Sequence, residues 1–132
     1  MDKLTIYIDA VSKGNPGQAG CGILIYKEGS LLKKLSIAIG ITTNNVAEYF
    51  AFIFGMIEGL NFKVKDIVVY TDSLLLVKQL KGEYRVKDEW LKRLHLIAQK
   101  LIKCYNKFEV IHIPRQDNKD ADKLANLSVS PH

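Results

Sequence analysis

The chain has 132 residues, 48% of them hydrophobic, and 19 Lys and Arg against 14 Asp and Glu give a net charge of +5. This length suits one domain with a buried core, and the basic balance favours a polyanionic partner. No apolar run is long enough for a membrane span, and the first residues enter a strand-like pattern at once, so we expect neither a membrane protein nor a signal peptide. Cys21 and Cys104 are too few for a disulfide framework, so a reduced, cytoplasmic protein is expected.

The first third of the chain predicts strands, because β-rich residues recur in short stretches over residues 4–9, 20–27 and 31–39. Residues 14–17 and Gly20 offer two tight turns between the first two stretches, and residues 28–30 form the next turn. These connections are too short for crossovers, which predicts an antiparallel meander.

The remaining residues alternate between helical and strand patterns. Helices are predicted over residues 45–60, 74–80, 89–104 and 118–128, and strands over 66–70 and 108–113. The order β-β-β-α-β-α-α-β-α is typical of an α/β protein in which helices cover one mixed sheet. No linker or repeat interrupts it, so we expect a single domain over residues 1–132, with a core over about 3–126 and a short tail over 127–132.

Two acids follow predicted strands. Asp9 ends the first strand, and Asp72 follows the apolar stretch 66–70, where α/β sheets commonly place their ligands. Each also has an ordinary structural explanation, since an Asp after a strand is often a solvated turn residue and Asp72 or Ser73 suits the cap of the next helix.

Two further acids lie in predicted helices. Glu48 is the only charged residue between Val46 and Ile57, so as a buried carboxylate it needs a partner, a proton or a metal. Asn45 as a helix cap with Glu48 three residues later is an equally good interpretation. Asp122 lies in the first turn of the last helix, where the helix dipole alone favours an acid.

Four motifs occur in order along the chain: Asp9 with Gly14-Asn15-Pro16-Gly17 and Gly20, Thr42-Thr43-Asn44-Asn45 with Glu48, Thr71-Asp72-Ser73, and Asn118 with Ala121-Asp122 and Leu124-Ala125. Together they resemble the type 1 ribonuclease H family, from Leu4 to about Asn126. The run at residues 115–118 is similar to the shorter branch found in archaea and some bacteria. The resemblance implies a five-stranded mixed sheet, three antiparallel and then two parallel strands, flanked by about four helices.

The resemblance also implies an activity, the hydrolysis of the RNA strand of RNA–DNA hybrids by an endonuclease that leaves 3′-hydroxyl and 5′-phosphate ends. In the family, four acids hold two Mg²⁺ or Mn²⁺ ions, and here those positions are Asp9, Glu48, Asp72 and Asp122, with Asp9 as the expected bridge. Oxygen ligands suit these hard cations, and two ions stabilise the attacking and leaving oxygens of an in-line displacement.

Substrate contacts are implied in the same way. Asn15, Asn44 and Asn45 match positions that contact the hybrid, partly at 2′-hydroxyls, and Thr43 matches a residue that binds a phosphate of the DNA strand. A side-chain amide both donates and accepts, as recognition of a 2′-hydroxyl requires. Helix capping and turn formation are the structural alternatives for the two consecutive asparagines.

The sequence departs from the best-known bacterial members, which carry a basic protrusion after the second helix. Only residues 81–87 span that region, and Lys87 is the expected substrate contact there, with weaker and more salt-sensitive binding than in those members. Arg115 is the expected contact near the last helix. His112, at the spacing of the family's loop histidine, falls inside a strand pattern and is assigned no role.

Two alternatives remain open on the sequence. Without the protrusion, double-stranded RNA is a second potential substrate. The second alternative is a catalytically silent module on the same fold that binds nucleic acid or protein. Such modules usually lose at least one acid, whereas this chain has all four. We expect a monomer.

Overall fold

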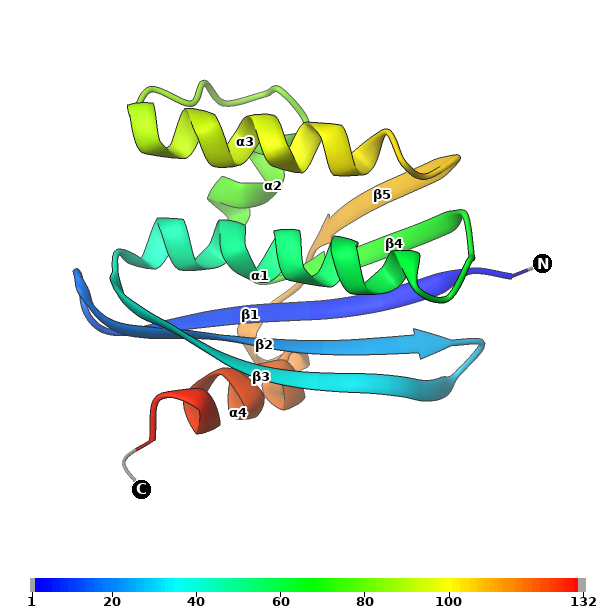
Figure 1. Cartoon of the computed structure of the whole chain (residues 1–132), viewed down its shortest axis with the longest axis horizontal. Helices are drawn as coiled ribbons and strands as arrows, with labels where there is room; N and C mark the ends of the chain where they lie inside the picture. Colours follow the sequence, from blue (N-terminus) through cyan, green and yellow to red (C-terminus); the bar gives the residue numbers. More distant parts are fainter. Residues whose placement is uncertain (1, 131–132) are drawn as a thin grey trace.

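A computed structural model describes residues 2–130, in which five strands form one sheet with the order β3-β2-β1-β4-β5 (Figure 1). The strands are β1 (Leu4–Gly14), β2 (Gly17–Lys27), β3 (Ser30–Thr42), β4 (Asp66–Thr71) and β5 (Lys107–His112). The first three pair antiparallel, whereas β4 pairs parallel with β1 and β5 parallel with β4. The expected fold class, three antiparallel strands followed by two parallel ones, is confirmed.

The helices are α1 (Asn44–Leu60), α2 (Leu74–Leu80), α3 (Glu89–Ile102) and α4 (Lys119–Ser128), and a short 3-10 helix, η1 (Arg115–Asp117), precedes the last. Helices α1, α2 and α3 lie on one side of the sheet and α4 alone lies on the other (Figure 1). Within residues 2–130 no helix combines the length and the apolar character that a membrane crossing requires.

The main core lies between the sheet and α1. Leu4, Ile6 and Ile8 of β1 are fully buried, and side chains alternate between the two faces of a strand, so all three point to the same side. At Gly55 of α1, a Cβ atom would lie 3.3 Å from the Cγ2 atoms of both Ile6 and Ile8. A small residue at this position lets the helix lie close to the sheet and fixes its distance from β1.

The first three strands are longer than the sequence predicted. β1 continues from Asp9 to Gly14, so Asp9 lies in the middle of a strand and the prediction that it ends the strand is wrong. The residues between β1 and β2 are Asn15 and Pro16, which form the turn. Gly20 lies inside β2 and makes no turn, and a Cβ atom there would collide with Ser128 Oγ of α4.

The N-terminal cap of α1 is Thr43, whose Oγ1 accepts a hydrogen bond from Val46 N at 3.3 Å. The interpretation of Asn45 as the cap is therefore wrong, and Glu48 does not complete a capping box because it lies five residues after the cap. Ser73 caps α2, as one of the two sequence alternatives proposed. Of the predicted C-terminal tail, residues 127 and 128 belong to α4, while Pro131 and His132 lie outside the described residues.

Candidate active site

Asp9 and Asp72 come together because their strands are parallel neighbours. The parallel register pairs Tyr7 of β1 with Tyr70 of β4, and each acid lies two residues further along its own strand direction. Because alternate residues share a face, Asp9 points to the side of the sheet opposite Ile8 and the α1 core. Asp72 follows the last residue of β4, at the carboxyl end of that strand.

Glu48 reaches the same place from α1. Its carboxylate is buried, with 6% of the residue exposed, and its Oε2 atom has no hydrogen-bond partner among the described residues. One carboxylate oxygen from each of Asp9, Glu48 and Asp72 lies within 4.8 Å of the others. Three buried or half-buried carboxylates at this spacing form an all-oxygen donor set of the kind that binds hard divalent cations.

Asp122 approaches from α4 on the other side. Gly22 of β2 is paired with Asp9, and a Cβ atom at Gly22 would collide with Ala121 O and lie 2.6 Å from Ala125 N. The absence of a side chain therefore lets the backbone of α4 rest on β2 beside Asp9. The carboxyls of Asp9 and Asp122 lie close enough to share a hydrogen bond when one of them is protonated, although Asp122 is not part of the group of three whose oxygens lie within 4.8 Å.

The crowding of these acids changes their proton affinity. Burial, the charges of Asp72 and Glu48 and the hydrogen bond with Asp122 raise the pKa of Asp9 to about 9, against a smaller lowering by the Ala10 backbone. Burial and the charge of Asp72 raise the pKa of Glu48 to about 8, partly offset by Arg115. Without a cation the cluster holds protons at neutral pH, because neighbouring like charges in a buried site resist ionisation.

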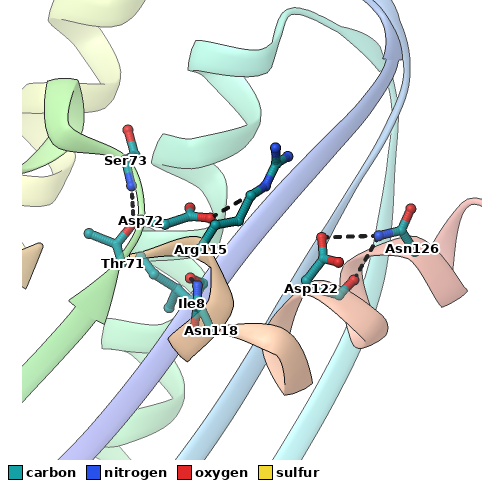
Figure 2. A network of polar contacts seen from close by, with 8 residues as sticks. All are labelled: Ile8, Thr71, Asp72, Ser73, Arg115, Asn118, Asp122 and Asn126. Carbon is teal, nitrogen blue, oxygen red and sulfur yellow. Dashed lines mark hydrogen bonds and ion pairs between the residues drawn. The ribbon is translucent and has the colours of Figure 1, made fainter. Parts of the chain in front are cut away.

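Arg115 and Asn118 border the cluster from η1 and the start of α4. Arg115 Nε lies 4.0 Å from Asp72 Oδ2 and its side chain is 86% exposed (Figure 2). Asn118 is buried, and its Nδ2 donates to Ile8 O at 2.8 Å, next to Asp9 in β1 (Figure 2). The sequence placed Asn118 in a motif without a role. The structure gives it one, which is to attach the start of α4 to β1.

The residues expected to contact substrate lie around the β1–β2 hairpin and the start of α1. Asn15 Oδ1 accepts a hydrogen bond from Asn44 N at 2.9 Å, which joins the hairpin to the helix. Thr43 caps the helix, and Asn15, Thr43, Asn44 and Asn45 are all exposed. The four residues therefore form one accessible surface, made by the β1–β2 turn and the start of α1, the helix that also carries Glu48.

Lys87 and His112 come from two further segments of the chain. Lys87 is exposed in the segment between α2 and α3, and it forms no ion pair among the described residues. His112 is the last residue of β5, is exposed and is paired with Thr71 of β4. The strand position that the sequence predicted for His112 is confirmed.

A cavity of about 560 Å³ lies beside the cluster, on the face of the sheet that α4 partly covers. It is lined by Tyr7 and Tyr26 of the sheet and by Asp117, Lys119 and Asp120 of η1 and α4, among others. None of the four acids lines it. Its charged lining residues are two aspartates and one lysine, Asp117, Asp120 and Lys119.

Comparisons with known proteins agree with this arrangement. The family described as reverse transcriptase-like matches residues 8–128. A ribonuclease HI of Halobacterium salinarum is 37% identical over 121 residues, which cover 91% of this chain. The chain spans only 61% of that relative's length, and 35% of a bifunctional protein of Mycobacterium tuberculosis.

Two solved structures superpose closely. The N-terminal RNase H domain of the Mycobacterium tuberculosis protein has a TM-score of 0.94 at 35% identity, and the match covers 97% of this chain and 99% of that one. An RNase H1 isolated from compost, solved in complex with an RNA/DNA hybrid, has a TM-score of 0.87 at 38% identity and 96% coverage of both chains. The fold therefore defines the class of protein as ribonuclease H-like, with Asp9 and Asp72 carried on neighbouring parallel strands. This chain belongs to the ribonuclease H family.

Proposed function

We propose that the chain is an endonuclease that hydrolyses the RNA strand of RNA–DNA hybrids and leaves 3′-hydroxyl and 5′-phosphate ends. The cluster of Asp9, Glu48 and Asp72 carries the proposal, because its three carboxylates could hold a metal ion and the only salt bridge it makes among the described residues is the 4.0 Å contact of Arg115 with Asp72. The compost RNase H1, whose fold this chain shares, was solved with an RNA/DNA hybrid, which supports the choice of substrate. We further propose that residues 1–132 act as one domain and as a monomer.

The donor set fits a divalent metal. Glu48 Oε2 is buried and has no hydrogen-bond partner within residues 2–130, and such an atom costs free energy unless a proton or a cation satisfies it. Asp9, Glu48, Asp72 and Asp122 would hold two Mg²⁺ or Mn²⁺ ions. When bound, the ions would activate a water and stabilise the attacking and leaving oxygens of the phosphodiester.

The other residues bind and orient the duplex. Asn15, Asn44 and Asn45 present amides that both donate to and accept from 2′-hydroxyls, which distinguishes RNA from DNA. Thr43 supplies a hydroxyl for a DNA-strand phosphate, and Arg115, largely exposed beside Asp72, supplies a cationic contact at the edge of the acids. Lys87 adds a second positive charge on the α2–α3 segment.

The charge distribution supports a nucleic-acid substrate. The whole chain is basic at +5, although three of its acids are gathered in one cluster. The rest of the surface is therefore more strongly positive than the net charge indicates, which attracts the phosphate backbone around an acidic centre. Cys21 and Cys104 are both free thiols, which supports a reducing compartment such as the cytoplasm.

The test compares the wild type with Asp72→Asn on labelled duplexes of 12–20 base pairs, namely RNA–DNA hybrid, dsRNA, dsDNA and single-stranded RNA, each with Mg²⁺, Mn²⁺ or EDTA. We expect metal-dependent cutting of the RNA strand of the hybrid, lost in Asp72→Asn. Asp120→Asn is the matched control, since Asp120 is an exposed acid in the first turn of α4. The dsRNA samples test the second substrate, because both duplexes present an A-like RNA strand.

An intact hybrid in every sample would contradict the proposal. A silent binding module would then be the better explanation, and it is distinguished by binding of the hybrid without cleavage.

A further inference from the structure

Asp122 is held by a neighbour one turn along α4. The side-chain amide of Asn126 donates through Nδ2 to Asp122 Oδ1 at 3.1 Å and to Asp122 O at 2.9 Å (Figure 2). A single amide thus fixes the carboxylate relative to its own backbone. The other three acids differ, since β1, α1 and β4 place them from within the packed centre of the molecule.

The amide of Asn126 is itself held by a residue far away in the sequence. Lys13, near the end of β1, donates from Nζ to Asn126 Oδ1 at 2.8 Å, across 113 residues of chain. The positive charge polarises the amide and strengthens its donation through Nδ2, because hydrogen bonds in a chain reinforce one another. The contact also selects which end of the amide faces Asp122, since only the oxygen can accept from Lys13.

The neutral amide between the two charges has a chemical consequence. A lysine bonded directly to Asp122 would neutralise the carboxylate and compete with a cation for it. Through Asn126 the orientation of Asp122 is fixed by a neutral donor, and the negative charge of the carboxylate remains available to a metal ion.

The hairpin that carries Lys13 is also bound to the substrate-contacting side of the site. Ser12 Oγ donates to Thr42 O at 3.1 Å, and Asn15 Oδ1 accepts from Asn44 N at 2.9 Å. Residues 12–15 therefore contact both the start of α1 and, through Lys13, the exposed side of α4. The hairpin joins the residues expected to read the RNA strand to the acid that lies furthest from the core.

We propose that Lys13 and Asn126 are positioning residues that hold Asp122 turned toward Asp9 in the geometry that binds metal. This inference rests on the proposed function, because it assigns Asp122 to the metal site. Neither residue touches the reacting phosphate. They act through Asp122, and the β1–β2 hairpin and α4 form one unit when both contacts are present.

The experiment uses Asn126→Leu, Lys13→Met and the double variant, all in the full chain. Mn²⁺ affinity is measured from the electron paramagnetic resonance signal of free Mn²⁺, and kcat and KM are measured on the RNA–DNA hybrid. The controls are Ser130→Ala, which removes a 3.0 Å hydrogen bond to the backbone carbonyl of Asn126 without touching its amide, and Lys34→Met, an exposed lysine of β3 that forms no ion pair among the described residues.

We expect Asn126→Leu to lower Mn²⁺ affinity and kcat by roughly 10- to 100-fold, as loss of a group that orients a ligand typically does, with KM within about 2-fold of the wild type. Lys13→Met should lower the same two quantities by a smaller factor, about 3-fold, since the amide still contacts Asp122. The double variant should be no worse than Asn126→Leu, because both changes break one chain of contacts. Both controls should match the wild type.

Wild-type Mn²⁺ affinity and kcat in Asn126→Leu, or a double variant in which the two losses multiply, would overturn the inference. If Asn126→Leu unfolds, Lys13→Met tests the inference, because it changes only an exposed strand residue. Wild-type Mn²⁺ affinity in Lys13→Met would equally overturn the proposal. A wild type that binds Mn²⁺ but leaves the hybrid intact would contradict the proposed function alone. The Mn²⁺ affinities of the variants would still test the positioning roles of Lys13 and Asn126. A wild type that binds no Mn²⁺ would contradict both.

Discussion

The two sides of the acidic site are built in different ways. Asp9, Glu48 and Asp72 are carried by two parallel strands and by a helix packed on them, so the apolar core fixes where their backbones lie. Asp122 is carried by α4, which lies alone on the opposite face of the sheet (Figure 1) and depends on close contact with glycines of β2 and on polar contacts at its surface.

This difference determines what a mutation on each side of the site should change. A side-chain change in the three-acid cluster removes a metal ligand but leaves the scaffold intact. A change beneath or beside α4 leaves every ligand present but displaces one of them. The first kind of change should affect chemistry with little loss of stability, and the second should affect both.

The largest effect is expected from Asp9→Asn. One oxygen of Asp9 lies within 4.8 Å of oxygens of both Glu48 and Asp72, and the Asp122 carboxyl lies close enough to raise the pKa of Asp9. Removal of its charge should lower kcat on the hybrid by more than about 100-fold, beyond the loss typical of groups that only orient a ligand. Single-turnover cleavage with saturating Mg²⁺ measures it, and retention of a tenth of the wild-type rate would contradict the assignment.

The next effect is expected from Gly22→Ala, on the α4 side. The added Cβ would collide with Ala121 O, and backbone cannot rotate away as a side chain can, so we expect a loss of about 3 kcal/mol in the free energy of unfolding. Cleavage should fall as well, because α4 carries Asp122. Urea unfolding measures the stability, and Gly29→Asn, at a turn position with open space around it, is the control. Equal stability of the two variants would contradict the close packing.

A smaller effect concerns pH in the absence of metal. Burial and neighbouring acids raise the pKa of Asp9 to about 9 and that of Glu48 to about 8 in the folded chain, whereas both groups ionise near pH 4 when unfolded. Between these values the folded state holds more protons than the unfolded state, so stability falls as pH rises from about 4 toward 9.

Thermal melts in EDTA should therefore show Tm falling between pH 5 and 9. Asp9→Asn should reduce that slope and raise Tm at pH 8, while Asp120→Asn should leave it unchanged. Added Mg²⁺ should restore stability at high pH, because the cation replaces the protons, and cleavage should rise from mildly acidic to alkaline pH for the same reason. A wild-type slope that Asp9→Asn leaves intact would contradict the role of this cluster.

The smallest effect is expected from Lys87→Ala, in the exposed segment between α2 and α3. Loss of one phosphate contact should raise KM for the hybrid a few-fold, leave kcat unchanged and reduce the slope of log affinity against log salt by about 1. Binding titrations between 50 and 200 mM salt measure the slope. An unchanged slope would remove Lys87 from the set of substrate contacts.

The sequence by itself determined the order and type of the elements, because hydrophobic periodicity is a local property. The predicted helices and strands all form, most with ends within one or two residues of those predicted. The motifs also led to the family and to the four acids, three of which the structure brings within 4.8 Å. The catalytic and substrate-contact roles of individual residues stay predictions.

Tertiary structure alone decided the rest. No local pattern indicates that β1 runs five residues past Asp9, that Gly20 and Gly22 make room for α4, or that Lys13 reaches Asn126. The extra strand length depends on pairing with β2, and the glycines and the lysine act across 100 residues or more of chain. Hydrophobic periodicity indicates which face of a helix or strand is buried. The distance between two elements depends instead on the side chains that pack between them, and this packing exists only in the folded protein.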